Sequence, residues 1–339
     1  PASDKRFTMR GLAWWKQNRG AFCRLPLTAE KIVRPEVWHL AQHPSSAHLA
    51  FRCNTTRLAV RVTNDSPGVM HHMPSTGSNG LVLYAGTPGR IRPWSNAIPD
   101  QSKPEFEREL FKELEKRPRE FNLYLPLYRA LLKLEIGIDR DATITAPSPL
   151  AISKPVVVYG TSITQGGCVA SPGSDWVSTV GRMLNIDTVN LGFSGNGKGE
   201  PELAHLLSEI DASLYILDYP GNTFPKELRK TLPKFLSILR AKRPDTPVMF
   251  QTPIVYSRFG FMQDVRERLI GLRDTMLEVY VRERKKGDAN LHLVDGFGLL
   301  PFGTDNAFCD GAHPADHGFR MIAERMAPAI AQILMRDAD

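Results

Sequence analysis

The sequence has little cysteine and no long apolar run. Among its 339 residues there are four cysteines, Cys23, Cys53, Cys168 and Cys309. Four cysteines are too few for a disulfide scaffold, and no pair shows the C-x-x-C spacing of a zinc site. We therefore expect mostly buried thiols. No stretch comes near the roughly 18 consecutive apolar residues that a membrane helix needs, so no membrane span is expected.

Acidic residues are fewer than basic ones, and the formal net charge is +7 at pH 7. The densest basic groups, RAKR at 240–243 and RERKK at 282–286, fall at the ends of predicted helices. The helix dipole favours positive side chains at such positions. Because no basic stripe is interleaved with aromatic residues, we do not expect nucleic acid as a partner.

The chain begins at Pro1, and no signal peptide is visible. An export signal that had been removed would fit a periplasmic or extracellular protein, so the compartment stays open. The sequence does not indicate the oligomeric state.

Residues 1–150 have the pattern of a β-sandwich, which we expect to form an accessory domain. Short segments alternate between apolar and polar residues, and turn-forming residues separate them. We expect a hairpin between the segments 47–53 and 57–63, with the residues NTT in its turn. The segment 105–116, EFERELFKELEK, is expected to form the main helix of this half.

Residues 151–339 change to an alternation of strands and helices, after a boundary at the Ala-Pro-Ser-Pro stretch 146–149. Such alternation predicts a parallel sheet with helices on both faces, which is a three-layer α/β/α fold. The predicted strands are 156–160, 187–192, 214–219, 247–253 and 291–296, and the predicted helices are 176–184, 202–210, 226–242, 263–286 and 318–335.

A serine stands at the end of the first predicted strand of this second half. In VVVYGTSITQGGC, the β-branched run has the pattern of a strand buried on both faces, and Gly160 permits a turn directly before Ser162. Ligands of open α/β sheets bind at this carboxyl edge of the strands. Ser162 is therefore either an ordinary turn residue or a nucleophile. The G-x-S-x-G elbow is not present, because Thr164 stands where that motif has glycine.

A candidate base lies near the end of the chain, in CDGAHPADHGF at 309–319. Asp310 and His313 are three residues apart, which puts a carboxylate and an imidazole on the same side of a turn. A nucleophilic serine needs such a base, and the base needs an acceptor for its second ring nitrogen. His313 on its own would also fit a capping or surface histidine.

Two histidine pairs raise the question of a metal. His313 and His317 are four residues apart, but Pro314 disfavours a regular helix that presents both rings on one face. His71 and His72 are adjacent, and adjacent residues of a strand face opposite ways. We expect no metal site, and we expect one of His71 and His72 to face the cleft between the domains.

Two further strand ends could supply the donors that stabilise an oxyanion. NLGFSGNGKGE at 190–200 is rich in glycine, so its backbone N–H groups can approach a ligand closely. DYPGNTF at 218–224 places Gly221 and Asn222 after a buried strand, and Asn222 offers a side-chain amide. Either loop alone fits an ordinary connection, but both lie on the edge of the sheet that carries Ser162.

Taken in order, these four blocks resemble the SGNH/GDSL hydrolase superfamily. The similarity covers about 154–335 and consists of GTSITQG, NLGFSG, PGNT and DGAHP. Thr161 and Thr223 stand where many members carry aspartate. The resemblance implies Ser162 as nucleophile, Gly195 as a backbone donor, Asn222 as a side-chain donor, and a terminal D-x-x-H-P block with Asp310 and His313.

The first half resembles the β-sandwich that precedes the hydrolase domain in one branch of this superfamily. HHMPSTGSNGLVLY is similar to the H-M-P and G-x-D-L-Y pattern of that branch, with Val82 where aspartate is usual, and LYLPLY extends the similarity. Members of this branch are often carbohydrate esterases or acyl hydrolases, and they are frequently exported.

Together these features predict a serine esterase without a metal or organic cofactor. Ser162 attacks the ester, His313 transfers protons, and Asp310 orients His313. The N–H groups of Ser162 and Gly195 and the amide of Asn222 form the oxyanion hole. The expected substrate is a small-molecule or carbohydrate ester. The alternatives are a non-catalytic carbohydrate-binding protein, a metal-dependent hydrolase that uses His313 and His317, and a lipase with a longer acyl preference.

Glycine-rich loops near the serine predict a short acyl group, most simply acetyl, because no apolar segment follows them to hold a long chain. We expect Trp14, Trp15 and Trp94 to be exposed and to suit a sugar. A disulfide between Cys168 and Cys309, which would tie the nucleophile loop to the base loop, is a hypothesis.

Overall fold

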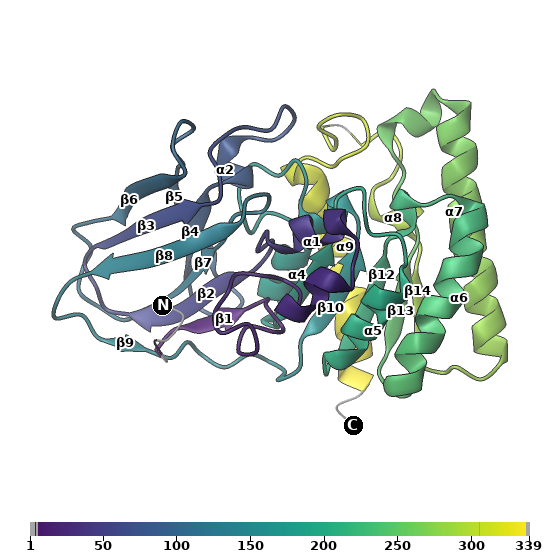
Figure 1. Ribbon diagram of the computed structural model, residues 1–339, viewed down its shortest axis with the longest axis horizontal. Helices are drawn as coiled ribbons and strands as arrows, with labels where there is room; N and C mark the ends of the chain where they lie inside the picture. The colour runs from purple at the N-terminus through teal and green to yellow at the C-terminus, as the bar shows by residue number, and fades with distance from the viewer. Residues whose placement is uncertain (1–3, 5, 305, 337–339) are drawn as a thin grey trace.

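Two kinds of β-sheet lie side by side in the computed structural model, which describes residues 4, 6–304 and 306–336. Antiparallel sheets occupy the first part of the chain and one parallel sheet the second (Figure 1). One hydrophobic core lies between the antiparallel sheets, and two others lie on the two faces of the parallel sheet. The α/β region preceded by a β-sandwich is therefore confirmed, whereas the division of the chain at residue 150 stays a prediction.

The antiparallel part is a sandwich of two sheets. A six-stranded sheet has the order β1-β2-β7-β4-β5, with β9 paired to β2, and a three-stranded sheet has the order β6-β3-β8. The strands are β1 (Thr8–Arg10), β2 (His48–Cys53), β3 (Leu58–Asn64), β4 (Leu81–Gly86), β5 (Arg92–Ala97), β6 (Glu105–Phe111), β7 (Arg119–Tyr124), β8 (Leu131–Ile138) and β9 (Ile144–Thr145).

Alternating side chains build the core between these two sheets. Along β3, Leu58, Val60 and Val62 point inward, whereas Arg61 faces solvent. The inward residues pack in one cluster with Phe51 of β2 and with other apolar residues of the facing sheet. This is the period of two that a half-buried strand requires.

The second part contains a five-stranded parallel sheet of order β11-β10-β12-β13-β14. Its strands are β10 (Val156–Gly160), β11 (Thr188–Gly192), β12 (Leu214–Asp218), β13 (Val248–Gln251) and β14 (Leu291–Val294). Strand β10 lies between β11 and β12, and all of its residues are buried. The carboxyl ends of β10, β11 and β12 therefore meet at one edge, at Gly160, Gly192 and Asp218.

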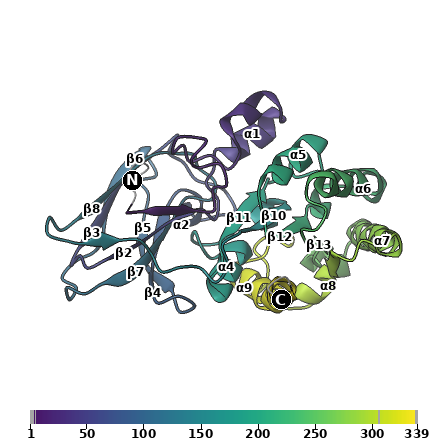
Figure 2. The same cartoon turned by 90° about the horizontal axis from the view of Figure 1, so that it is seen from below.

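Helices cover both faces of the parallel sheet, which makes three layers (Figure 2). Helices α5 and α6 lie on one face, with α7 beside α6, and α4 and α9 lie on the other. The helices are α1 (Pro35–Ala41), α2 (Ser75–Ser78), α3 (Ser162–Gln165), α4 (Trp176–Leu184), α5 (Pro201–Glu209), α6 (Pro225–Lys242), α7 (Gln263–Lys285), α8 (Gly296–Leu299) and α9 (Asp316–Arg336), with short 3-10 helices at Leu27–Lys31, Pro220–Asn222 and Ser257–Gly260. None of the described helices is long and apolar enough to cross a membrane.

The hairpin predicted between 47–53 and 57–63 is wrong. These segments form β2 and β3, which belong to different sheets. The intervening NTT carries the chain from one sheet to the other, and Asp139 holds it by accepting hydrogen bonds from Thr55 Oγ1 and from the backbone N–H of Thr56, at 3.0 and 2.6 Å. Alternation predicts strands, but it does not say which strand pairs with which.

The helix predicted over 105–116 is also wrong, because Glu105–Phe111 forms strand β6. The two residues of β6 that are buried, Phe106 and Leu110, are four positions apart, which fits one face of a helix and equally one face of a strand. Pairing with β3 decides between them, and an ion pair of 2.9 Å between Arg61 and Glu107 joins the two strands. Tertiary pairing thus overrides the helix propensity of glutamate, leucine and lysine.

An early segment of the chain packs against the parallel sheet rather than inside the sandwich. Trp14, Leu25 and Val37 share one hydrophobic cluster with residues of β10, β12 and α5–α7. Trp14 is buried and its Nε1 donates to Glu209 at 3.3 Å, so the expected exposure of this tryptophan is wrong. Trp15 is half-buried, and of the three tryptophans only Trp94 is exposed, at 44%.

Candidate active site

Ser162 is the first residue of the short helix that follows β10. Thr161 caps this helix, since its side chain accepts from the N–H of Ile163, and Gly166 ends it with a left-handed φ of 97°. Gly160 is required by close approach, because a Cβ there would lie 1.9 Å from Thr164 Oγ1. This turn leaves Ser162 partly exposed at the edge of the sheet. Strand β10 thus ends at Gly160, and the turn after it places the Ser162 side chain at the carboxyl edge of the sheet.

Ser162, His313 and Asp310 form one chain of hydrogen bonds. Ser162 Oγ lies 2.8 Å from His313 Nε2, and His313 Nδ1 lies 2.8 Å from Asp310 Oδ2. The other oxygen, Asp310 Oδ1, accepts from the backbone N–H groups of His313 and Ala312, at 2.8 and 3.0 Å. The aspartate thus holds both the ring and the loop that carries it.

The carboxyl group of Asp310 is ionised at neutral pH. Partial burial acts to raise its pKa, but the hydrogen bonds from the backbone and ring of His313 and from Ala312 lower that pKa to about 2. An ionised carboxylate accepts the Nδ1 proton of His313 and so leaves Nε2 free to accept the Ser162 hydroxyl proton. The arrangement can activate a serine for acyl transfer.

The two other predicted loops lie at the same edge. Gly195 is exposed with a φ of +67°, and no described residue accepts a hydrogen bond from its N–H or from that of Ser162. Asn222 Nδ2 donates to Phe193 O at 3.3 Å, which uses one of its two amide hydrogens. Arg268 holds the Asn222 loop by donating to the carbonyls of Gly221 and Thr223.

Gln165 links the candidate nucleophile to the other parts of the site. Its Oε1 accepts from the N–H of Ser194, at 2.9 Å, in the loop that contains Gly195. Its Nε2 donates to the carbonyl of Leu127, at 3.2 Å, in the first half of the chain. One buried amide therefore fixes the position of the serine helix relative to the donor loop and to the sandwich.

Asp218 is a buried carboxylate beneath the serine helix. Thr164 Oγ1 donates to it at 2.7 Å and Gln251 Nε2 at 2.9 Å, and Thr164 Oγ1 also accepts from the N–H of Thr161. Burial raises the pKa of Asp218 to about 7, against the opposing hydrogen bond from Thr164. In the unfolded chain the same group ionises near its ordinary value of 3.8.

This difference predicts how stability depends on pH. Between pH 4 and 7 the folded protein holds a proton that the unfolded chain has lost, so rising pH lowers the free energy of unfolding. Asp218→Asn removes that dependence, and once the side-chain amide of Gln251 turns over, the introduced amide can donate to Gln251 Oε1, which is buried without a partner among the described residues. From pH 5 to pH 8, wild type should lose on the order of 2 kcal/mol more than the variant. Urea unfolding at both pH values measures this, and parallel losses in the two proteins would contradict it.

Residues outside the four sequence blocks also surround the site. The rings of His71 and His72 lie 4.4 Å apart because they occupy a tight turn rather than a strand, and the ring of His72 lies 5.8 Å from that of His313. His72 is therefore the member of the pair that faces the site. A Cβ on Gly221 would lie 3.1 Å from the hydroxyl of Tyr256, so this tyrosine borders the Asn222 loop. The sequence indicated that one of the two histidines would face the cleft, but not which one, and it gave no indication of the Tyr256 contact, because that contact joins distant segments.

The cysteines are free thiols in the structure, so the hypothesised disulfide between Cys168 and Cys309 is not formed there. Three of the four are buried, and Cys309 is exposed. Burial raises the pKa of the Cys168 thiol, which lies beside Cys309 and Asp310. In the described part of the chain, the metal-ligating atoms that cluster within 4.8 Å are those of Cys168, Asp310 and His313, a group that does not include His317.

Comparison with known families decides the class of the protein. The model of the GDSL-like lipase/acylhydrolase family matches residues 153–331. The chain belongs to this family. A second model, GxDLY, which describes the N-terminus of SGNH_hydro-type esterases, matches residues 2–144. Both parts of the predicted resemblance are thus confirmed, and the GDSL family member described here is a carboxylic ester hydrolase.

Solved structures resemble this GDSL hydrolase over nearly its whole length. A protein described as a GDSL-like lipase from Bacteroides ovatus ATCC 8483 is 30% identical, with a TM-score of 0.91, over 99% of this chain and 97% of the other. A salicylyl-acyltransferase from a tetracycline biosynthetic pathway shares the fold at 21% identity and a TM-score of 0.80, over 98% and 96%. A family two carbohydrate esterase from Clostridium thermocellum shares it at 16% and 0.60, over 86% and 93%. No curated protein matches the chain.

Proposed function

We propose that this GDSL hydrolase is a serine esterase that removes short acyl groups, chiefly acetyl, from a carbohydrate. The observation that carries the proposal is the hydrogen-bonded chain from Ser162 Oγ through His313 to Asp310, with both distances at 2.8 Å. A serine without a catalytic role does not require a hydrogen bond to an imidazole that is itself held by a carboxylate. A nucleophilic serine does, because its hydroxyl must lose a proton as it attacks.

The proposed reaction has two stages. Ser162 Oγ attacks the ester carbonyl while His313 Nε2 takes the hydroxyl proton, and His313 then gives that proton to the departing alcohol. A water next attacks the acyl-enzyme, loses its proton to the same nitrogen, and releases the acid. Asp310 keeps the ring in the required tautomer and stabilises its charged form. The N–H groups of Ser162 and Gly195 and the amide of Asn222 would bind the oxyanion in both stages.

Asn222→Ala should lower kcat by roughly thirtyfold to a thousandfold, which corresponds to roughly 2–4 kcal/mol of transition-state stabilisation for one oxyanion donor. KM should change much less, because the negative charge that Asn222 binds is absent from the bound ester. Steady-state kinetics with p-nitrophenyl acetate measures both. Asn96→Ala, at an exposed position on β5, is the control and should leave kcat unchanged. A change confined to KM would show that Asn222 only binds substrate.

The preference for a carbohydrate is supported by the accessory sandwich and by the carbohydrate esterases that share the fold, among them an acetyl xylan esterase from Butyrivibrio proteoclasticus. The preference for a short acyl group is supported by the tight loops around the serine. Gly167, for example, cannot take a Cβ without approaching the Tyr128 hydroxyl to 2.9 Å. Tyr128, a buried residue of the first half, thus limits the space behind Ser162.

A second candidate, an esterase with a longer or aromatic acyl preference, is favoured by a different observation. A cavity of about 650 Å³ adjoins the loop of Asp310 and is lined by Tyr256, Phe261 and Phe302. Phe261 is 86% exposed and Phe302 55%, so apolar surface is available beside the site. Each buried CH₂ would contribute about 0.8 kcal/mol if a chain packed there.

Turnover of p-nitrophenyl acetate, butyrate and octanoate distinguishes these candidates. The proposal predicts the highest kcat/KM with acetate and a steady decline with chain length. If kcat/KM instead rises toward octanoate in wild type, and this rise is lost in Phe261→Ser, the acetyl preference is wrong and the cavity beside Phe261 binds the acyl chain.

A further inference from the structure

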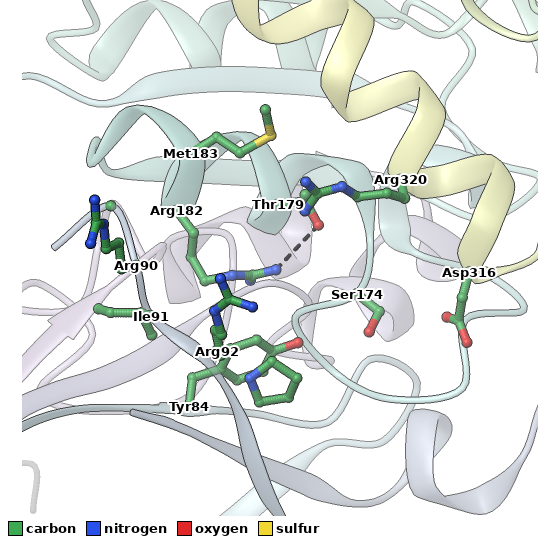
Figure 3. Close-up of a pocket in the computed structure, with 12 residues that line it drawn as sticks. Tyr84, Arg90, Ile91, Arg92, Ser174, Thr179, Arg182, Met183, Asp316 and Arg320 are labelled. Carbon is green, nitrogen blue, oxygen red and sulfur yellow. Dashed lines mark hydrogen bonds between the residues drawn. The ribbon is translucent and has the colours of Figure 1, made fainter. Parts of the chain in front are cut away.

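A cavity of about 590 Å³ lies where the sandwich meets the α/β region (Figure 3). Residues of the β4–β5 hairpin line it on one side, and residues of α4 and α9 line it on the other. Ser162, Asp310 and His313 are not among its lining residues. The cavity is therefore separate from the candidate active site.

The cavity is strongly basic. Arg90, Arg92, Arg182 and Arg320 line it, and Asp316 is the one carboxylate among the lining residues. Arg320 is paired with Glu324 at 2.6 Å. Arg90 and Arg92 are exposed, and across residues 4, 6–304 and 306–336 neither has an ion-pair partner. Several positive charges thus face one cavity without a matching number of carboxylates, an arrangement that attracts anions.

Arg182 is held rigidly at this cavity. Its guanidinium lies over the rings of Tyr84 and Tyr124, with 4.3 and 5.2 Å to the ring centroids, and its Nη2 donates to Thr179 at 3.2 Å. Its Nη1 is buried and has no hydrogen-bond partner in the described part of the chain. Aromatic faces rather than a salt bridge therefore fix this cation at the wall of the cavity.

A nearby carboxylate does not neutralise Arg182. Asp175 interacts electrostatically with it, but this buried carboxylate already accepts hydrogen bonds from Ser46 and from the backbone and hydroxyl of Ser178. Burial alone would lower the pKa of Arg182, yet Tyr124 and Tyr84 beside it hold that pKa above its ordinary value. Arg182 consequently stays charged in its buried position.

A second cavity, of about 570 Å³, is a neighbour of the first, since Arg92 and Pro93 of β5 line both. Arg52, Arg117 and Arg119 add positive charge there, whereas Glu120 adds one carboxylate and Arg117 is paired with Glu115 at 3.2 Å. Trp94 also lines it and is 44% exposed. We call these two neighbouring cavities together the groove, and their combined length suits a ligand longer than a single ion.

We propose that this groove binds a carboxylate-bearing saccharide chain, with carboxylate groups paired to its arginines and a sugar ring against Trp94. The guanidinium fork matches a carboxylate with two parallel hydrogen bonds, and an aromatic ring offers an apolar platform to a pyranose. The inference rests on the proposed carbohydrate esterase function and names the chemical class of its polymer. A nucleic acid fits less well, because the groove has one exposed tryptophan and two carboxylates rather than repeated aromatic residues.

The test is calorimetric titration of the full chain with a galacturonate hexamer that carries no ester, so that it is a ligand and not a substrate. We expect saturable binding that weakens with added salt, no binding of a neutral cellohexaose, and weaker binding of a hexanucleotide. Arg92→Gln, at the position common to both cavities, should raise Kd by about tenfold, whereas Arg140→Gln, an exposed arginine outside the groove, should leave it within about twofold. Trp94→Ala should also weaken binding.

Hydrolysis of p-nitrophenyl acetate is measured on the same samples and should be unchanged in Arg92→Gln. A protein that hydrolyses the ester but does not bind the galacturonate hexamer overturns this inference and leaves the esterase proposal standing. A protein that binds the galacturonate hexamer but does not hydrolyse the ester supports this inference and overturns the esterase proposal. Equal weakening by Arg92→Gln and Arg140→Gln, or tighter binding of the hexanucleotide, also overturns the inference.

Discussion

Ser162→Ala should lower kcat for p-nitrophenyl acetate by about a thousandfold or more while the protein stays folded. Ser162 Oγ is the atom that attacks in the proposed reaction, and a methyl group offers no nucleophile to His313 Nε2, now 2.8 Å from the hydroxyl. The partly exposed side chain contributes little to the core, so the melting temperature should change by only a few degrees. Initial rates on purified protein, with thermal unfolding alongside, measure both quantities.

Ser171→Ala is the matched control for this variant. Ser171 lies on the loop that follows the candidate nucleophile, and its hydroxyl is 3.2 Å from that of Ser174 rather than from His313. It should keep turnover within about twofold of wild type, as surface substitutions away from a reacting group usually do. If the purified Ser162→Ala variant retains near-wild-type turnover, another residue attacks the ester and the assignment is wrong.

His313→Ala should lower kcat by a similar factor, about a thousandfold or more, because base and nucleophile act as one unit. The substitution removes the group that takes the Ser162 proton and leaves Asp310 without its ring partner. His317→Ala is the control, since His317 lies on the first turn of α9 and none of its hydrogen bonds reaches Ser162. It should retain most activity. The reverse result, with His317→Ala inactive and His313→Ala active, would transfer the role of base to His317.

The α/β half of the fold could be predicted from the sequence because short segments are enough to identify its strands and loops. Runs such as Val156–Gly160 are short, rich in β-branched residues and end in glycine, which favours a buried strand, and the loops after them hold the glycine, serine and asparagine that the blocks require. Parallel strands bring their carboxyl ends to one edge, so order along the chain was enough to predict that these loops meet. The structure places Ser162 and His313 together although they are 151 positions apart in the sequence.

The sandwich half was harder to predict from the sequence because its strands pair with partners that lie far away along the chain. Nothing in the NTT segment shows that it joins two sheets, and the spacing of Phe106 and Leu110 fits a helix as well as a strand. The contribution of the sandwich to the site was predictable only in part, for the same reason. The sequence indicated that His71 or His72 faces the cleft, but the carbonyl of Leu127 reaches the loop of the candidate nucleophile only through the packing of the two halves.

The central claim is that His313 and Asp310 activate Ser162, and labelling by a fluorophosphonate tests it most directly. Only an activated serine attacks this reagent at a useful rate, and the phosphorus then stays bound to the serine oxygen. Intact-protein mass spectrometry should show one adduct per chain, and peptide mapping should place it on Ser162. Labelling should be lost in Ser162→Ala and slowed strongly in His313→Ala. A protein that remains unlabelled while folded, or that carries the adduct on another serine, would contradict the account and favour a carbohydrate-binding role without catalysis at this site.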